Sequence, residues 1–331
     1  MLPNHWYAIL ESREVKRGRL TGVTRLGEKL VLWRAADGAI GCLQDQCPHR
    51  GAALSAGKII HDHVECPFHG FQFDPGGRCQ LIPANGRHAQ IPKAFQARAY
   101  PAREAHGLIW VWWGEARQDL PEIPWFESID STFSYWTFRD HWAVDYTRAI
   151  ENQLDVVHLP FVHATTIGRG GRTLVNGPLV RWQNGSQGAA DRMDLWVYND
   201  VDRGQEPLKP SEIPDPQRRP FLQLYLPNVW QNWISDSIRV FVAFAPIDRE
   251  NTMIYLRFYQ NSVRLPILRR LVPLIATPFN VIILRQDKRV VLTQRPKRTE
   301  LRMGEKLIQG DAPIVAFRRR REELLQTASA D

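Results

Sequence analysis

The sequence predicts an α+β protein, in which an all-β N-terminal domain precedes a domain where helices cover an antiparallel sheet. Two observations support this fold class. Short apolar runs separated by turn residues fill the N-terminal third of the chain, and strand-like segments alternate over residues 177–260 between two helical stretches. The chain also has 331 residues, more than one domain usually needs, so we expect two domains.

The boundary between the domains is expected just after residues 108–113, an apolar run typical of a buried strand. The residues that follow are typical of a linker: Gly114, Pro121 and Pro124. We therefore predict that residues 1–118 form the first domain and that residues 119–331 form the second.

Composition limits the class of protein. Hydrophobic residues make up 44% of the chain and charged residues 24%, which is typical of a soluble globular protein. Four cysteines are too few for a disulfide framework, and the N-terminus lacks the basic and apolar segments of a secretory signal. We therefore expect a cytoplasmic location. The most apolar stretch, residues 271–284, is too short to span a bilayer and contains two prolines.

The net charge of +8 permits a nucleic acid, an anionic membrane or an acidic protein as a partner. No nucleic-acid-binding motif accompanies the charge, so we do not expect nucleic-acid binding. The densest basic run, residues 318–323, ends in two glutamates and is expected to lie on a solvated helix.

Several elements can be placed in chain order. In the first domain we expect strands at residues 30–33, 40–43 and 70–73, the last followed by a turn at residues 74–77. In the second domain we expect strands at residues 195–198, 221–225, 238–244 and 253–259. A loop at residues 166–172 and a helix at residues 279–294 complete the predicted elements.

Two short loops in the first domain each offer one cysteine and one histidine. Cys47 is followed by His49, and Cys66 is followed by His69, in the pattern C-x-H-x16-C-x2-H. A structural zinc site takes four such ligands, but it usually pairs cysteine with cysteine and histidine with histidine. A Rieske [2Fe–2S] cluster places two cysteines on one iron and two histidines on the other, and two Cys-His loops suit that division better.

A second candidate metal site lies in residues 151–163. On a helix at 100° per residue, four polar side chains fall within about 140° of one another: Asn152, Asp155, His158 and His163. Two histidines with one carboxylate form the facial triad of non-haem Fe(II) oxygenases. Pro160 is expected to kink or break the helix between the two histidines. Taken alone, two histidines at this spacing are more often core or surface residues of an amphipathic helix than metal ligands.

Together, the two motifs resemble those of the oxygenase α subunits of the Rieske non-haem iron oxygenases. The resemblance extends over nearly the whole chain in order and spacing, and it is carried by residues 47–51, 66–71 and 151–163. The chain looks most like the short, single-subunit members, the vanillate and dicamba O-demethylase-like monooxygenases. This resemblance implies a Rieske domain followed by a catalytic domain built on a helix-covered antiparallel sheet.

The resemblance also implies two metal sites. The ligands of a [2Fe–2S] cluster would be Cys47 and Cys66 on one iron and His49 and His69 on the other. The ligands of a mononuclear Fe(II), with positions open for O2, would be His158, His163 and Asp287. Asp287 is implied as the third ligand because a V-V-x-x-Q tail that is common in the family ends here at Gln294.

A path for electrons follows from the same resemblance. Asp155 would accept a hydrogen bond from His158 and link it to His69 of a neighbouring subunit, while Asn152 would lie beside the iron. Such a contact implies a head-to-tail homotrimer. The chain has no G-x-G-x-x-G nucleotide loop, so electrons from NAD(P)H would arrive through a ferredoxin or a flavin/iron–sulfur reductase. Such carriers are usually acidic, which would give the positive charge a use.

The expected reaction is hydroxylation or oxidative demethylation of a small aromatic or cyclic substrate. Ring cis-dihydroxylation is the alternative. The chain length, without a separate β-subunit signature, favours hydroxylation or demethylation over this alternative. An electron-carrying Rieske protein is a remote alternative, because it would need no second domain. Four aromatic residues are candidate substrate contacts, although each can belong to the core instead: Trp230, Trp233, Phe241 and Phe244.

Overall fold

The structure is a computed structural model that describes residues 1–330 except 116, 184–189, 264 and 266–267. The chain divides into two compact units. The first unit contains residues 3–123 together with residues 245–248. The second contains residues 124–244 and 249–331.

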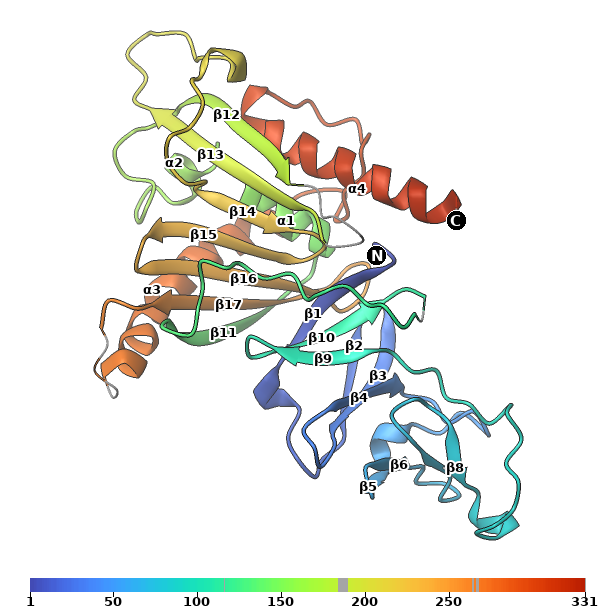
Figure 1. Ribbon diagram of the computed structural model, residues 1–331. Coiled ribbons are helices and arrows are strands. Elements are labelled where there is room, and N and C mark those ends of the chain that lie inside the picture. Colours follow the sequence, from blue (N-terminus) through green and yellow to red (C-terminus); the bar gives the residue numbers. More distant parts are fainter. Residues whose placement is uncertain (116, 184–189, 264, 266–267, 331) are drawn as a thin grey trace. The chain divides into compact units, whose positions relative to one another are not determined.

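The first unit is all-β and contains three antiparallel sheets (Figure 1). One sheet has the order β1 (His5–Glu11), β10 (Leu108–Trp113) and β9 (Ala102–Ala105). Another is formed by β2 (Thr21–Arg25), β3 (Glu28–Arg34) and β4 (Ile40–Gln44). The third is formed by β5 (Lys58–Ile60), β6 (His63–Glu65), β7 (Gln72–Phe73) and β8 (Cys79–Leu81). The strands predicted at residues 30–33 and 40–43 are confirmed, whereas only residues 72–73 of the strand predicted at 70–73 form a strand.

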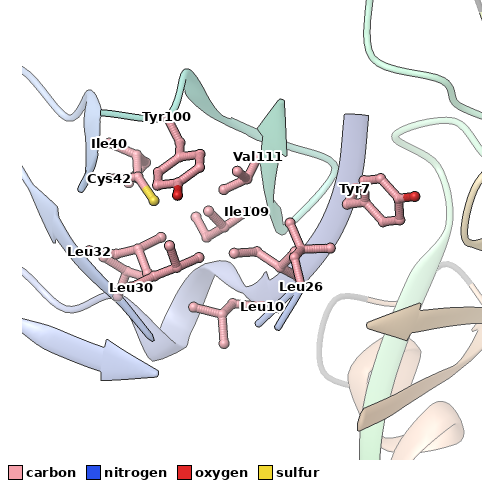
Figure 2. Close-up of a cluster of buried hydrophobic side chains, with 12 residues drawn as sticks. Tyr7, Leu10, Leu26, Leu30, Leu32, Ile40, Cys42, Tyr100, Ile109 and Val111 are labelled. Carbon is pink, nitrogen blue, oxygen red and sulfur yellow. The ribbon is translucent and has the colours of Figure 1, made fainter. Parts of the chain in front are cut away.

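Strand β3 is buried on both faces because it separates two apolar clusters. Leu30 and Leu32 lie in the cluster shown in Figure 2, whereas Val31 and Trp33 lie in the other cluster. This division follows from the alternation of side chains along a strand, and it explains why the sequence reads as a continuous apolar run. The second cluster also contains Cys47 and Cys66. The cysteines of both Cys-His loops are therefore anchored in a hydrophobic core.

The second unit is built on a seven-stranded sheet with the order β11-β17-β16-β15-β14-β13-β12 (Figure 1). The strands are β11 (Ser134–Trp142), β12 (Leu174–Gln183), β13 (Arg192–Asp200), β14 (Leu222–Tyr225), β15 (Val229–Ser235), β16 (Ile238–Pro246) and β17 (Thr252–Gln260). The four strands predicted for this region are β13, β14, β16 and β17. No individual strand was predicted for β11, β12 or β15.

Four helices belong to the second unit: α1 (Tyr146–Leu154), α2 (Leu159–Val162), α3 (Leu268–Val291) and α4 (Ala312–Ala330). Helix α3 packs against β11 and β17, α4 packs against β12, and α1 contacts both of these helices (Figure 1). The predicted α+β class is thus confirmed. The helix expected at residues 279–294 begins eleven residues earlier than predicted, at Leu268. Within the described ranges, no helix has the length and hydrophobicity that crossing a membrane requires.

The basic run of α4 is not solvated along its whole length, so that part of the prediction is wrong. Arg318 and Arg321 are buried. Arg318 donates to both carboxylate oxygens of Glu151 at 2.7 Å and to Glu305 at 2.6 Å. Arg148 donates to the same two glutamates at 3.3 and 3.0 Å. Paired carboxylates thus allow the guanidinium groups to be buried, and the network joins α4 to α1.

Candidate functional site

The two Cys-His loops of the first unit are closed in the same way. In each loop the cysteine N–H donates to the carbonyl five residues later, at 2.8 Å for both Cys47 and Cys66. The glycine four residues after each cysteine donates back to the cysteine carbonyl, at 2.9 Å from Gly51 and 3.0 Å from Gly70. Both glycines have a positive φ, +76° and +73°, which glycine adopts without strain. The loops therefore present their ligands in equivalent positions.

The side chains of these loops form an inner and an outer pair. Cys47 and Cys66 are buried, whereas His49 and His69 are exposed and have their Nδ1 atoms 3.2 Å apart. Burial raises the pKa of the Cys47 thiol to about 11, so a bound metal would be needed to hold it as a thiolate at neutral pH. Two sulfur ligands inside and two nitrogen ligands outside fit a cluster whose two irons have different ligands.

A second group of metal-type ligands lies in the second unit. His158, His163 and Asp287 have ligand atoms that all lie within 4.8 Å of one another. Oδ1 of Asp287 lies 2.9 Å from Nε2 of His163 and 3.4 Å from Nε2 of His158. His163 and Asp287 are buried. The structure thus brings together the three side chains that the sequence singles out for a 2-His-1-carboxylate site.

The hydrogen bonds of this group leave a position for a cation. Nδ1 of His163 lies 2.8 Å from Oε1 of Gln286, an acceptor, so Nδ1 carries the proton in this arrangement. Nε2 of His163 then points a lone pair at Oδ1 of Asp287, which has no hydrogen-bond donor among the described residues. Two acceptors 2.9 Å apart need a positive charge beside them, which a metal ion or, without metal, the protonated His158 would supply. The residues therefore fit a bound metal ion. Gln286 already holds Nδ1 of His163, the ring nitrogen that would not bind the metal.

Protonation of the metal-free group follows from its charges. Burial opposes the charged form of His158, but Asp155 and Asp287 outweigh it and raise its pKa to about 9. Burial likewise opposes ionisation of Asp287, but His158 and His163 outweigh it and lower its pKa to about 2. A metal ion would have to displace the proton of His158 before it could bind there.

The local fold differs from the single helix expected for residues 151–163. Helix α1 begins at Tyr146 and ends at Leu154, and the side chain of the preceding residue, Asp145, caps it by accepting from the Thr147 N–H. Asp155 has extended backbone angles, and the chain turns before the single-turn helix α2. Pro160 lies within the first turn of α2, where its missing N–H has no intrahelical partner to lose. The predicted break at Pro160 is wrong: the break occurs five residues earlier, and the histidines flank α2.

Asp155 stabilises the turn between these helices. Its Oδ1 accepts from the backbone N–H groups of Val157 at 2.7 Å and His158 at 3.1 Å. The same oxygen lies 3.6 Å from Nδ1 of His158, which is too long for a hydrogen bond. Asn152 lies on α1, and its buried Nδ2 has no hydrogen-bond partner among the described residues. The roles predicted for Asp155 and Asn152 remain predictions.

Two glutamines near the ligands were not identified from the sequence. Gln286 contacts His163, and its amide is also held by Thr165 at 3.2 Å and Thr166 at 2.9 Å. Gln153 donates from Nε2 to Oδ2 of Asp287 at 3.2 Å. Gln286 precedes Asp287 and Gln153 follows Asn152, two residues that the sequence predicts at the iron site. Because glutamine is common on helix surfaces, adjacency alone is too weak a signal to find such partners.

The four candidate substrate contacts do not share one face of the sheet. Trp230 and Trp233 are three residues apart on β15, and Phe241 and Phe244 are three apart on β16, so each pair is divided between the two faces. The strand registers place Trp230 and Phe244 on the same face as Asn199, whose amide donates to the Val156 carbonyl beside the iron-type ligands.

The other two candidates lie on the opposite face. Phe241 is fully buried there against Trp125 and Phe126, with ring centroids 5.1 and 6.2 Å apart. Trp233 pairs across the strands with Arg239, whose guanidinium lies 3.3 Å from the centre of the Trp233 ring. Only Trp230 and Phe244 therefore remain as candidates on the face that carries the metal-type ligands.

Comparison with protein-family models gives two matches. Residues 5–97 match the model of the Rieske [2Fe-2S] domain. Residues 142–327, more than half of the chain, match the model of the vanillate O-demethylase oxygenase C-terminal domain. The first match contains all four side chains of the Cys-His loops, and the second contains His158, His163 and Asp287.

Comparison with curated proteins gives partial matches. The chain is 39% identical over 147 residues to the vanillate O-demethylase oxygenase subunit of Pseudomonas sp. (strain ATCC 19151), covering 43% of each protein. It is 36% identical over 162 residues to the dicamba O-demethylase oxygenase component of Stenotrophomonas maltophilia, covering 48% of this chain and 47% of the relative. The matched part of the chain thus spans less than half the length of these relatives.

Comparison with solved structures supports the fold. NdmA of Pseudomonas putida CBB5 superposes with a TM-score of 0.75, covering 99% of this chain and 92% of NdmA at 22% sequence identity. At this identity the likeness shows the fold alone.

Proposed function

The chain belongs to the family that joins a Rieske [2Fe–2S] domain to a vanillate O-demethylase oxygenase C-terminal domain, and from this premise we propose that it is the oxygenase component of a Rieske non-haem iron monooxygenase. It would activate O2 at a mononuclear Fe(II) and hydroxylate or oxidatively demethylate a small aromatic or cyclic substrate. Ring cis-dihydroxylation is the alternative reaction.

One observation carries the proposal: the chain holds two separate ligand sets of different chemistry. Two thiols and two imidazoles converge in the first unit, with the histidine nitrogens 3.2 Å apart. Two imidazoles and one carboxylate converge in the second unit, with ligand atoms within 4.8 Å. A pure electron carrier needs only the first set, whereas an oxygenase needs both.

The iron of the second site would supply O2 activation and oxidation of the substrate, which protein side chains cannot supply. The chain's own residues would set the coordination. Gln286 would keep Nδ1 of His163 protonated, so that Nε2 is available as a ligand. Gln153 would hold Oδ2 of Asp287, so that Oδ1 faces the two imidazoles. Asn152 would offer its unpaired Nδ2 to a substrate or a water molecule.

Electrons would come from an acidic ferredoxin or from a flavin/iron–sulfur reductase supplied by NAD(P)H, and the positive charge of the chain supports such a partner. We further propose a head-to-tail homotrimer in the cytoplasm, in which Asp155 links His158 to His69 of a neighbouring subunit. The side chain of Asp155 is 27% exposed, so one carboxylate oxygen can still accept a hydrogen bond from another chain.

Metal analysis tests the proposal. Protein produced with ample iron and sulfide is expected to contain about three irons per chain with acid-labile sulfide and no stoichiometric zinc, because one proposed ligand set would bind a two-iron cluster and the other a single iron. The measurement is elemental analysis combined with a sulfide assay. One zinc per chain without sulfide would rule out the Rieske assignment.

Asp155→Asn is expected to slow electron transfer between the two sites while both still load with metal. The amide keeps the size of the carboxylate but loses its charge, and changes to residues that orient a metal ligand typically cost about 10–100-fold. A single-turnover experiment on pre-reduced protein would follow reoxidation of the cluster after substrate and O2 are added. Asp202→Asn, in an exposed loop, is the control and should leave the rate unchanged. Unchanged reoxidation in fully loaded Asp155→Asn protein would show that Asp155 is not the link.

A further inference from the structure

The outer face of α3 is apolar over four turns. Six large apolar side chains on it are 40–74% exposed: Leu268, Leu271, Leu274, Ile275, Phe279 and Ile282. They follow one another at the spacing of a single helix face, within about 140° at 100° per residue. We call these six residues the α3 stripe. Isolated exposed apolar residues need no explanation, but a continuous stripe marks a binding surface.

The charges on the segment that carries the α3 stripe are all positive. Residues 251–286 contain five arginines and no aspartate, glutamate or lysine. Arg270 flanks the stripe near its beginning, and Arg285 and Arg289 continue the same face beyond its end; all three are exposed. Asp287, the first acid after this segment, is buried with His158 and His163 and faces away from the α3 stripe. The stripe is therefore an apolar surface with a cationic border.

These charges disfavour pairing of the α3 stripe with a second copy of itself. In a parallel or an antiparallel pair of such helices, every charge from residues 251–286 at the contact would be an arginine. These residues contain no acid that could compensate the repulsion. An anionic surface has the opposite sign and does not have this problem.

An exposed aromatic residue lies where the α3 stripe begins. Ser134, the first residue of β11, donates from Oγ to the Arg269 carbonyl at 2.5 Å. Trp136, two residues further along β11 and therefore on the same face as Ser134, is 40% exposed. Tyrosine and tryptophan are the side chains that favour the interface between membrane and water, since one part of each is apolar and another is polar.

We propose that the α3 stripe binds the surface of an anionic lipid bilayer, with α3 lying along the interface. Its apolar residues would enter the boundary between headgroups and acyl chains, and its arginines would contact lipid phosphates. Such binding needs no membrane-crossing helix. It is independent of the proposed oxygenase reaction, because it uses neither ligand set.

Vesicle sedimentation of the full-length, metal-loaded protein tests the proposal. We expect binding to phosphatidylcholine vesicles that contain phosphatidylglycerol, at least about tenfold weaker binding to phosphatidylcholine alone, and weaker binding at high salt. Ile275→Glu/Phe279→Glu should reduce binding at least about tenfold. Ile308→Glu is the matched control, because Ile308 is 63% exposed outside the helices and should not contribute. If the double variant does not fold, Ile275→Ser replaces it.

Light scattering in the absence of vesicles completes the experiment. The double variant is expected to keep the molar mass of the wild type. The proposal is overturned if the wild type binds no anionic vesicles, if the double variant binds as well as the wild type, or if the double variant has a lower mass. The last result would identify the stripe as a contact between copies of the chain.

Discussion

His163→Ala is expected to abolish product formation while leaving the [2Fe–2S] cluster intact. His163 is buried, its Nε2 lies 2.9 Å from Asp287, and Nδ1 is held by Gln286, so alanine would remove one of the three proposed iron ligands. Iron content should fall from about three to about two per chain, because the cluster ligands belong to the other unit. The measurements are elemental analysis, the visible spectrum of the cluster and product formation under reducing conditions.

His141→Ala is the matched control for this experiment. His141 lies in the same unit on β11, is exposed, and contacts Asn251 at 2.9 Å. It should keep full iron and activity. A His163→Ala protein that folds but loses its cluster spectrum would mean that the two ligand sets are not separate. A variant that keeps the third iron and turns over normally would show that His163 is not a ligand.

The structure brings together the two groups of side chains that the sequence singles out as ligands, because such groups consist of few residue types at fixed spacing. The Cys-His loops need a glycine with positive φ four residues after each cysteine, and that requirement is visible in the sequence at Gly51 and Gly70. Buried strands such as β3 were also predictable, because a strand covered on both faces reads as a continuous apolar run.

The failures have physical causes that lie outside local sequence. The end of α1 before Asp155 is accompanied by hydrogen bonds from the backbone N–H groups of Val157 and His158 to the Asp155 side chain, and a helical pattern does not reveal them. The sequence also did not show that Trp230, Trp233, Phe241 and Phe244 are divided between the two faces of the sheet, which follows because residues three apart on a strand point to opposite faces. Strand β11 has exposed aromatic residues and lies at the edge of the sheet, so its pattern lacks the buried alternation of a central strand.

The burial of Arg318 was unpredictable for a different reason. One partner, Glu151, is far from Arg318 in sequence and lies on α1; the other, Glu305, lies outside α4. In the sequence, each carboxylate resembles an ordinary surface charge. Only the tertiary fold shows that the arginine run has a buried face. Loss of Arg318 should therefore destabilise the protein strongly, since it would leave a buried carboxylate without its main partner.

Arg318→Ala is expected to lower the free energy of unfolding of the second unit by about 3–5 kcal/mol, the usual cost of removing one partner of a buried ion pair. Arg318 and Glu151 have side chains that are each 3% exposed, and two hydrogen bonds of 2.7 Å join them. Urea unfolding followed by tryptophan fluorescence measures the difference. Arg319→Ala is the control: Arg319 is exposed on the same helix, so its removal should change stability by less than about 0.5 kcal/mol. If Arg318→Ala does not fold, Arg318→Lys should show an intermediate loss, because lysine keeps the charge but not the paired geometry.

The stability lost in Arg318→Ala should also depend on pH in a defined direction. Burial already raises the pKa of Glu151 in the wild type, although Arg318 opposes that shift. Without Arg318 the pKa of Glu151 should rise further, so the folded variant favours the protonated form more than the unfolded chain does. A carboxyl group whose pKa is raised on folding stabilises the protein below its unfolded pKa and loses that contribution as pH rises through its folded pKa. The difference between Arg318→Ala and the wild type should therefore be smaller at pH 5 than at pH 8. An equal difference at both pH values would show that the uncompensated charge of Glu151 is not the cause, and that lost packing of the arginine side chain is.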